Sequence, residues 1–335
     1  LPIERKRRHE MNAKLYLPIA AITFFALFPA HADYFDAVRG SVMNYKFADF
    51  TLPANPGETT YWEEAGSLPT TVSRSDTTGS YIALSINGPL VGDNIYATSN
   101  PGIGIQYKTS VDTLTDAGGG TESTPNSRFN LGQQVAADIS TYVHVKYRLV
   151  RLTNKIPAGK ITSAPQVTAT FYNPDGRGTA VFTHGIYSST IASQPKTTSC
   201  TVDAPTEIKL PALYGNKLKN GAQTITEAPT IKLINCPGAI DGISYNFSAV
   251  YGARDASNGI LNAVNGDGYA QNVYIQVQNA DGTPHTVNSS IALSDYAGSG
   301  EYEIPEFKVA YYIENIESVT AGEVKSAIEL KLTYN

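Results

Sequence analysis

Apolar and polar residues alternate in short runs along most of this chain, and each run stops at a cluster of turn-forming residues. The clearest runs cover residues 142–150, 167–172, 273–278, 307–313 and 328–334. An alternation of period two places apolar side chains on one face of a β-strand and polar side chains on the other. No long stretch has the 3.6-residue period of a helix. The pattern therefore predicts an all-β protein made of β-sandwich domains.

Residues 1–32 are predicted to be a short upstream stretch followed by a secretory signal peptide. From Met11 a basic region precedes an apolar stretch over residues 15–28, and Ala30-His31-Ala32 has the small-x-small pattern of a cleavage site. The apolar stretch is shorter than the ~20 residues that a membrane span needs. Residues 1–10 contain four consecutive basic residues, as nuclear signals do, but their place ahead of Met11 favours upstream coding sequence. We expect an exported chain that begins at Asp33.

The charge of the expected mature chain argues against nucleic acid as a partner. Removing residues 1–32 takes away five of 25 Lys and Arg and two of 30 Asp and Glu, which leaves 20 against 28. An acidic protein repels nucleic acid and anionic membranes.

The length of the mature chain predicts two domains, because single domains usually hold ~100–200 residues. The best boundary is the polar segment at residues 193–199, which contains Pro195 and precedes the first cysteine. We expect one domain over residues 33–195 and a second over residues 196–335.

The two cysteines, Cys200 and Cys236, both lie in the second domain. In an exported protein, such a pair is expected to form a disulfide, and the spacing of a zinc or CxxC motif is absent. A reactive thiol is the less favoured alternative.

The C-terminal run has one apolar face, formed by Ile328, Leu330, Leu332 and Tyr334, and one polar face. A half-buried strand with no following partner either closes its sheet elsewhere in the fold or leaves an edge for another polypeptide. Whether the sheet is closed within the fold or left open for another polypeptide decides much of the function.

The second domain resembles the pilin domain of chaperone-usher fimbrial adhesins. The residues that carry this resemblance are 200–202, 208–211, 231–236, 273–277, 281–283, 319–324 and Tyr334. It implies an immunoglobulin-like domain that lacks its seventh strand and is completed by donor-strand complementation. The implied partners are a periplasmic fimbrial chaperone, an outer-membrane usher and the next fimbrial subunit, which supplies a donor strand to the edge at Ile328–Tyr334. A self-closed immunoglobulin-like domain is the alternative.

The order of the domains resembles that of two-domain tip adhesins, because a separate sandwich stands where an internal subunit has its own donor strand. Residues 88–96, 102–108, 145–150, 156–161 and 167–172 look like framework strands of N-acetylglucosamine-binding fimbrial lectins. Unlike those lectins, the first domain has no cysteine, so sugar identity is not carried over. The resemblance implies a fimbrial tip at the cell surface that attaches to a host glycan or glycoprotein. The alternative is a protein-binding adhesin or a structural tip adaptor.

A sugar site needs carboxylates or amides for the hydroxyls and an aromatic face for the ring. The single tryptophan, Trp62, lies beside two carboxylates, and a core role is its equal alternative. The polar stretch at residues 112–134 is predicted to be one long loop or a pair of loops, where binding residues usually lie. The candidate ligand-binding residues are Trp62, Asp112, Thr113, Asp116, Asn126 and Arg128.

Enzymatic and metal-dependent functions have weaker support. No Gly-x-Ser-x-Gly motif occurs; Ser244 and Ser299 come nearest to it, and the neighbouring carboxylates Glu63 and Glu64 would point to opposite faces of a strand. His144 and His184 are the metal candidates, but a zinc site needs about three protein ligands. We therefore expect no catalysis and no cofactor.

Overall fold

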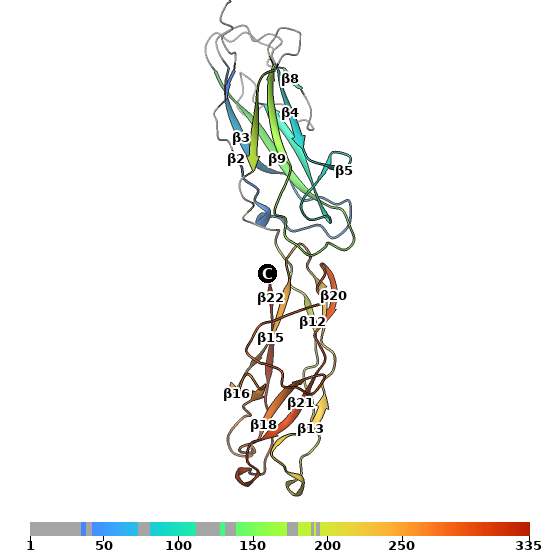
Figure 1. The fold of residues 1–335 in the computed structure, drawn as a ribbon, viewed down its shortest axis with the longest axis vertical. Helices are drawn as coiled ribbons and strands as arrows, with labels where there is room; N and C mark the ends of the chain where they lie inside the picture. The colour runs from blue at the N-terminus through green and yellow to red at the C-terminus, as the bar shows by residue number, and fades with distance from the viewer. Residues whose placement is uncertain are drawn as a thin grey trace, which may run out of the picture. The chain divides into compact units, whose positions relative to one another are not determined.

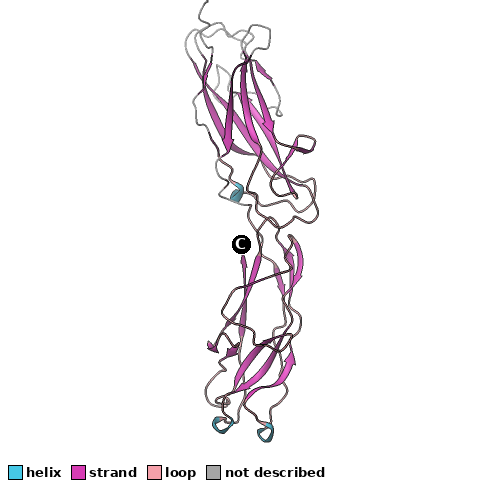
Figure 2. Cartoon of the chain, viewed as in Figure 1, coloured by secondary structure: helices cyan, strands magenta, loops and turns pink. Residues whose placement is uncertain are grey.

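The chain folds almost entirely into β-strands, as its alternation predicts. A computed structural model describes residues 35–37, 42–72, 81–111, 128–130, 139–172, 180–188, 191 and 195–335. All of them lie in one compact unit, Tyr34–Asn335. The helices in these ranges are three short 3-10 turns, Phe47–Asp49, Gly215–Lys217 and Ile316–Ser318 (Figure 2). The predicted signal peptide lies outside the described residues. None of the described helices has the length and apolar character needed to cross a lipid bilayer.

Two sheets form the first sandwich. One sheet has the order β1-β3-β9-β7-β6-β5 and the other the order β2-β11-β10-β4-β8 (Figure 1). The bounds are β1 Phe35–Ala37, β2 Val42–Met43, β3 Glu63–Val72, β4 Tyr81–Asn87, β5 Leu90–Gly92, β6 Ile95–Ala97, β7 Ile103–Val111, β8 Arg128–Asn130, β9 Ile139–Arg151, β10 Gln166–Tyr172 and β11 Ala180–Ser188. The two sheets enclose a common core that includes residues of β3, β7 and β9 from one sheet and of β4 and β10 from the other.

The alternation along β9 sets the inner and outer faces of the larger sheet. Val145, Tyr147 and Leu149 are fully buried, whereas His144, Lys146 and Arg148 between them are half-buried. The same rule holds in β7, where Ile105 and Tyr107 point into the core. Period-two side-chain geometry therefore builds an apolar inner face and a charged outer face from one strand.

Aromatic side chains fill the core of the first sandwich. The rings of Tyr45, Phe47 and Phe50 lie 4.9, 5.9 and 5.5 Å from the ring of Tyr147. The hydroxyls of Tyr45 and Tyr107 share a hydrogen bond of 2.7 Å, and Tyr147 Oη accepts the backbone N–H of Lys46 at 2.6 Å. The buried tyrosine hydroxyls therefore have polar partners, without which their burial would be costly.

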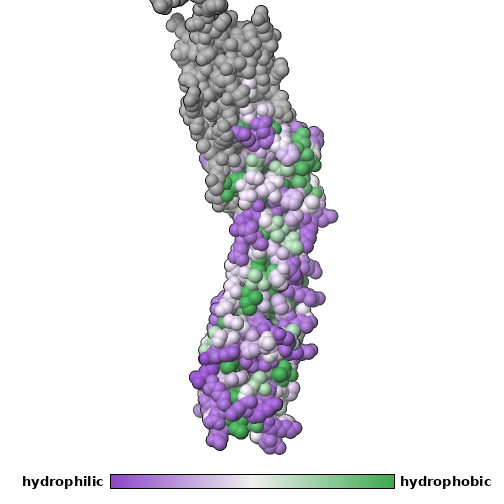
Figure 3. All heavy atoms as spheres, viewed as in Figure 1, coloured by the Kyte–Doolittle hydropathy of each residue, from purple (hydrophilic) through white to green (hydrophobic). Residues whose placement is uncertain are grey.

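Three smaller sheets form the second domain. Their orders are β12-β14-β20, β13-β21-β18-β17-β16 and β19-β15-β22. The bounds are β12 Thr201–Asp203, β13 Gly221–Glu227, β14 Lys232–Cys236, β15 Ile243–Ala249, β16 Ala253–Asp255, β17 Ile260–Leu261, β18 Tyr274–Asn279, β19 Ile291–Ala292, β20 Gly300–Glu303, β21 Phe307–Ile313 and β22 Ile328–Tyr334. Their inner faces share a second core. On the side shown in Figure 3, polar and apolar side chains are interspersed over this domain.

The segment predicted as a linker is partly attached to the first sandwich. Pro195 is buried, and the N–H of Lys196 donates to the Phe50 carbonyl at 2.7 Å. An isolated parallel bridge joins Thr51 and Lys196. The placement of the domain boundary at residue 195 stays a prediction.

Candidate functional site

Trp62 lies outside the core, on the outer face of the sheet that contains β3, β9 and β7. Its side chain is half-buried, just before β3. The Lys108 ammonium and the Arg148 guanidinium both lie 4.5 Å from the centre of the Trp62 ring. Such contacts are cation–π interactions, which attract a positive charge to the face of an aromatic ring. The tryptophan therefore holds two cations in place at the protein surface.

Strand register arranges the residues around Trp62 in rows across the sheet. Arg148 is paired with Gln106, and its Nε donates to Gln106 Oε1 at 2.8 Å. In the next row, Lys146 lies between Glu64 of β3 and Lys108 of β7. Directly paired residues share a face of an antiparallel sheet. The result is a surface that carries three cationic side chains, two of which lie against the Trp62 ring.

The third row contains His144, which lies between Ser67 and Ser110. Its Nδ1 is 3.0 Å from Glu64 Oε1, an ion pair when the imidazole is protonated. Glu63, the neighbour of Glu64, instead accepts from Lys46 Nζ at 2.9 Å. The two adjacent carboxylates thus engage different partners, and the structure gives no sign that they flank one bond.

Most of the other predicted ligand-binding residues cannot be placed. Asp112, Thr113, Asp116 and Asn126 lie outside the described residues. The backbone of Arg128 is described: it belongs to β8, an edge strand of the sheet opposite the one beside Trp62, and is paired with Ala83. β8 thus falls within the stretch predicted to be loop, and Trp62 and Arg128 lie on different sheets.

The two histidines that are metal candidates also lie on different sheets. His144 belongs to β9, and His184 belongs to β11, where it is paired with Ala169. Among the described residues, no group of three His, Cys, Asp or Glu side chains could hold a metal ion.

The two serines nearest to a hydrolase motif have structural partners. Ser299 Oγ accepts the backbone N–H of Ile156 at 2.8 Å, and Ser244 Oγ accepts from the side-chain amide of Asn335 at 3.3 Å. Within the described part of the chain, neither serine forms a hydrogen bond with a histidine.

The strand β22 is the second candidate site. It pairs along its whole length with β15, from Ile243–Tyr334 to Ala249–Ile328, and forms the edge of its sheet (Figure 1). Its four apolar side chains contact the second core, yet all four are only half-buried. An apolar face that is half-covered and an edge that pairs with no described strand are the features of an unfinished sheet.

Hydrogen-bond alternation shows which backbone groups of β22 lie on the open edge. The N–H of Asn335 donates to the Gly242 carbonyl, and the N–H of Val250 donates to the Ala327 carbonyl. Hydrogen-bonded and non-hydrogen-bonded pairs alternate in an antiparallel ladder. Ala327, Asn335 and every second residue between them therefore bond to β15 or to the residues that flank it, and the N–H groups of the four apolar residues point to the open side. These residues are Ile328, Leu330, Leu332 and Tyr334.

A second extended segment contacts the same core from residues 204–213. Ile208 and Leu210 alternate with exposed residues and are half-buried against the second core. The segment starts near the end of β22, because the Cys200 N–H donates to Tyr334 Oη at 2.7 Å. It runs toward the beginning of β22, since Leu213 and Val324 pack against one small cluster. Between the two segments, no backbone hydrogen bond is present among the described residues. We call the space between residues 204–213 and β22 the edge groove.

The predicted disulfide is present and fixes one end of the edge groove. Cys200 and Cys236 are bonded, with Cα atoms 4.3 Å apart. The bond ties the segment that precedes β12 to the end of β14. Cys200 therefore connects the disulfide directly to Tyr334 on the opposite flank.

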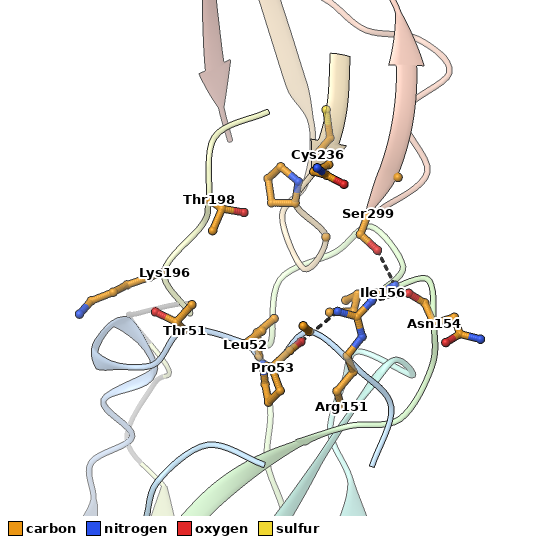
Figure 4. Close-up of a pocket in the computed structure, with 15 residues that line it drawn as sticks. Thr51, Leu52, Pro53, Arg151, Asn154, Ile156, Lys196, Thr198, Cys236 and Ser299 are labelled. Carbon is orange, nitrogen blue, oxygen red and sulfur yellow. Dashed lines mark hydrogen bonds between the residues drawn. The ribbon is translucent and has the colours of Figure 1, made fainter. Parts of the chain in front are cut away.

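A pocket of ≈ 460 Å³ lies beside the disulfide that fixes one end of the edge groove, because Cys236 is one of its lining residues. Residues from both halves of the chain line it, among them Leu52, Arg151, Lys196, Pro237 and Ser299 (Figure 4). Arg151 donates to the carbonyl oxygens of Pro53, Thr153 and Asn154. Its guanidinium thus links the loop that contains Pro53 to the loop that contains Thr153 and Asn154.

Comparison with known proteins identifies the second domain. Residues 186–335 match the model of the fimbrial protein family. This match confirms the resemblance of this part of the chain to fimbrial proteins, which was inferred from its cysteines and strands. No curated protein sequence matches the chain.

Solved structures with similarity to the chain include other fimbrial and pilus proteins. The CupB6 tip adhesin from Pseudomonas aeruginosa is 17% identical, with 90% of this chain and 94% of that chain covered and a TM-score of 0.42. A chaperone-usher pilus subunit is 20% identical over 43% of this chain and 97% of its own, with a TM-score of 0.29. The P pilus rod subunit PapA is 18% identical over 44% and 99%, with a TM-score of 0.31.

The cationic neighbours of Trp62 were not predicted. Lys108, Lys146 and Arg148 alternate with apolar residues in their strands, and this signal alone places them on the outer face. These three cations lie around Trp62 because β7, β9 and β3 pair with one another, and the local sequence does not encode this pairing.

Proposed function

We propose that this chain is the adhesin at the tip of a chaperone-usher fimbria. In this proposal the fimbrial protein domain anchors the chain, and the sandwich that precedes it binds a receptor, a glycan on a host surface. The family match supports the fimbrial assignment. The tip position is supported by a sandwich of two sheets, rather than an extended donor strand, in front of the fimbrial domain.

The observation that carries the anchoring function is the half-buried, unpaired edge of β22. A strand placed in the edge groove would pair with the free N–H groups of β22 and cover its apolar side chains. The partner in the periplasm would be a fimbrial chaperone, and at the outer-membrane usher the donor strand of the next subunit would replace it. The chain would thus pass through the periplasm to the cell surface.

The first test compares the two faces of β22. We expect Leu330→Asp with Leu332→Asp to abolish capture by the periplasmic chaperone in co-purification. The matched control, Glu329→Thr with Lys331→Thr, changes the exposed face of the same strand and should retain capture. Equal capture of both double variants would contradict the proposal.

Hydrogen exchange provides a test that needs no variant. The backbone amides of Ile328, Leu330, Leu332 and Tyr334 should exchange quickly in the free chain and slowly in the chaperone complex. The alternate amides, which face β15, should be protected in both samples. If all amides of β22 were protected equally without a partner, the sheet would be closed.

The receptor-binding function is tested with a glycan array probed by the full chain. Binding to a defined set of glycans supports it. Binding to a protein receptor with no response on glycans would replace the glycan-binding function by a protein-binding adhesin. Silence on both would favour a structural tip adaptor.

A further inference from the structure

The outer face of the β3-β9-β7 sheet concentrates positive charge in a chain whose net charge is −5. Lys108, Lys146 and Arg148 lie within two adjacent rows, and His144 lies in the next. Glu64 is a carboxylate on the same rows, and it is 3.0 Å from His144. We call the surface formed by Trp62, Gln106, Lys108, Lys146 and Arg148 the basic face.

Arg148 is the central group of the basic face. Its side chain contacts the neutral Gln106 amide and the Trp62 ring, and no carboxylate of the described residues lies within ion-pair distance. Partial burial lowers the pKa of its guanidinium, since the charge loses water without gaining a negative partner. A guanidinium held against an aromatic ring and a glutamine is already oriented before any ligand arrives.

We propose that the basic face binds an anionic glycan through its sulfate or carboxylate groups. The inference rests on the proposed receptor-binding role of the first sandwich and names the chemical class of the receptor. Arg148 provides a planar pair of donors that suits a carboxylate or sulfate, and Lys108 and Lys146 provide point charges beside it.

The geometry favours a linear polymer with repeated anionic groups. Neighbouring strands are about 4.8 Å apart, and side chains on one face of a strand repeat at about 6.8 Å. The cations of β7 and β9 therefore lie close enough together on a flat surface to bind two anionic groups of one polymer at the same time.

The experiment measures binding of the full chain to immobilised glycans at several salt concentrations. The probes are a sulfated glycosaminoglycan, a carboxylated polysaccharide without sulfate, a neutral polysaccharide and a single-stranded oligonucleotide. Comparing the first two separates sulfate from carboxylate as the recognised group. Binding to at least one of them, with affinity that falls as salt rises, is the expected result.

Two variants locate the site. Arg148→Gln and Lys108→Gln should each lower affinity about tenfold or more, the factor that corresponds to ~1.4 kcal/mol. Lys219→Gln removes the same charge from an exposed position in the fimbrial domain and should leave affinity unchanged. The salt dependence of the unaltered chain tests charge recognition even if a variant folds poorly.

Three outcomes would overturn the inference. The first is binding to neutral glycans only, unaffected by Arg148→Gln, which would leave the proposed adhesin function intact. The second is equal binding to the oligonucleotide, which would make the face a general polyanion surface. The third is the absence of binding to any glycan, which would also overturn the glycan-binding part of the proposed function.

Discussion

Removing the Cys200–Cys236 disulfide should destabilise the fimbrial domain and leave the first sandwich unaffected. The bond closes a loop with a sequence separation of 36. The loop-entropy relation for a loop of this length gives a loss of about 3.8 kcal/mol at 25 °C on replacing both cysteines by alanine. The loss concerns the domain that holds both cysteines.

The single tryptophan makes this prediction selective. Trp62 belongs to the first sandwich, so its fluorescence follows that sandwich during urea unfolding. Far-UV circular dichroism follows both domains. For a slope of ~1–3 kcal/mol per molar urea, the midpoint of the fimbrial domain should fall by more than ~1 M. The midpoint seen by Trp62 should not move.

The control is the unaltered chain treated with a thiol reductant, which should reproduce the shift. An unchanged second transition in the double alanine variant would refute the reasoning. So would an equal fall in the Trp62 transition, because it would mean that both domains unfold as one cooperative unit.

Further predictions concern the cores and the undescribed loop. Tyr147→Phe leaves the Lys46 N–H without its acceptor and should cost about 1–3 kcal/mol, measured by the Trp62 urea transition; a cost near zero would show that water replaces the hydroxyl. Burial lowers the pKa of His285, so stability should fall as the pH drops below the ordinary histidine pKa of 6.5 and stop falling once the folded-state pKa is passed. Replacing His285 by Gln should flatten this dependence in thermal unfolding, and an unaltered pH profile would assign it to other groups. Asp112→Ala should weaken receptor binding with little change in melting temperature, and unchanged binding would move the site toward Trp62.

Local alternation was enough to predict several of the long strands, but not β3 or β11. β21 begins and ends where the alternation of Phe307 and Ile313 does, and β22 coincides with the predicted C-terminal strand. Because one face of these strands is more buried than the other, apolar and polar residues alternate in their sequence. Short strands such as β12 and β8 carry three residues each, too few for any period to show.

The candidate sites were predicted unevenly for a related physical reason. The edge of β22 was predicted because all four of its apolar residues belong to one strand. The surroundings of Trp62 required the register between β3 and β9, which places Glu64 opposite Lys146 across 82 residues of chain. Such pairing is decided by packing of whole sheets, so the sequence near Trp62 showed two carboxylates and not the cations.

The attachment of Lys196 to the first sandwich has a mechanical consequence for the proposed tip adhesin. Tension between a receptor and a fimbrial shaft would reach the first sandwich along the chain at Pro195–Lys196 and through the hydrogen bonds that residues 156–159 form with residues 239–240 and 297–299. The Lys196 N–H is bound to Phe50, and the bridge to Thr51 is parallel. Nearby, β2 and β11 also run parallel, with Tyr187 beside Val42. When two parallel neighbouring strands are pulled in opposite directions along their length, the force loads all their hydrogen bonds at once. Such a pair separates by shear and not by the successive rupture of single bonds.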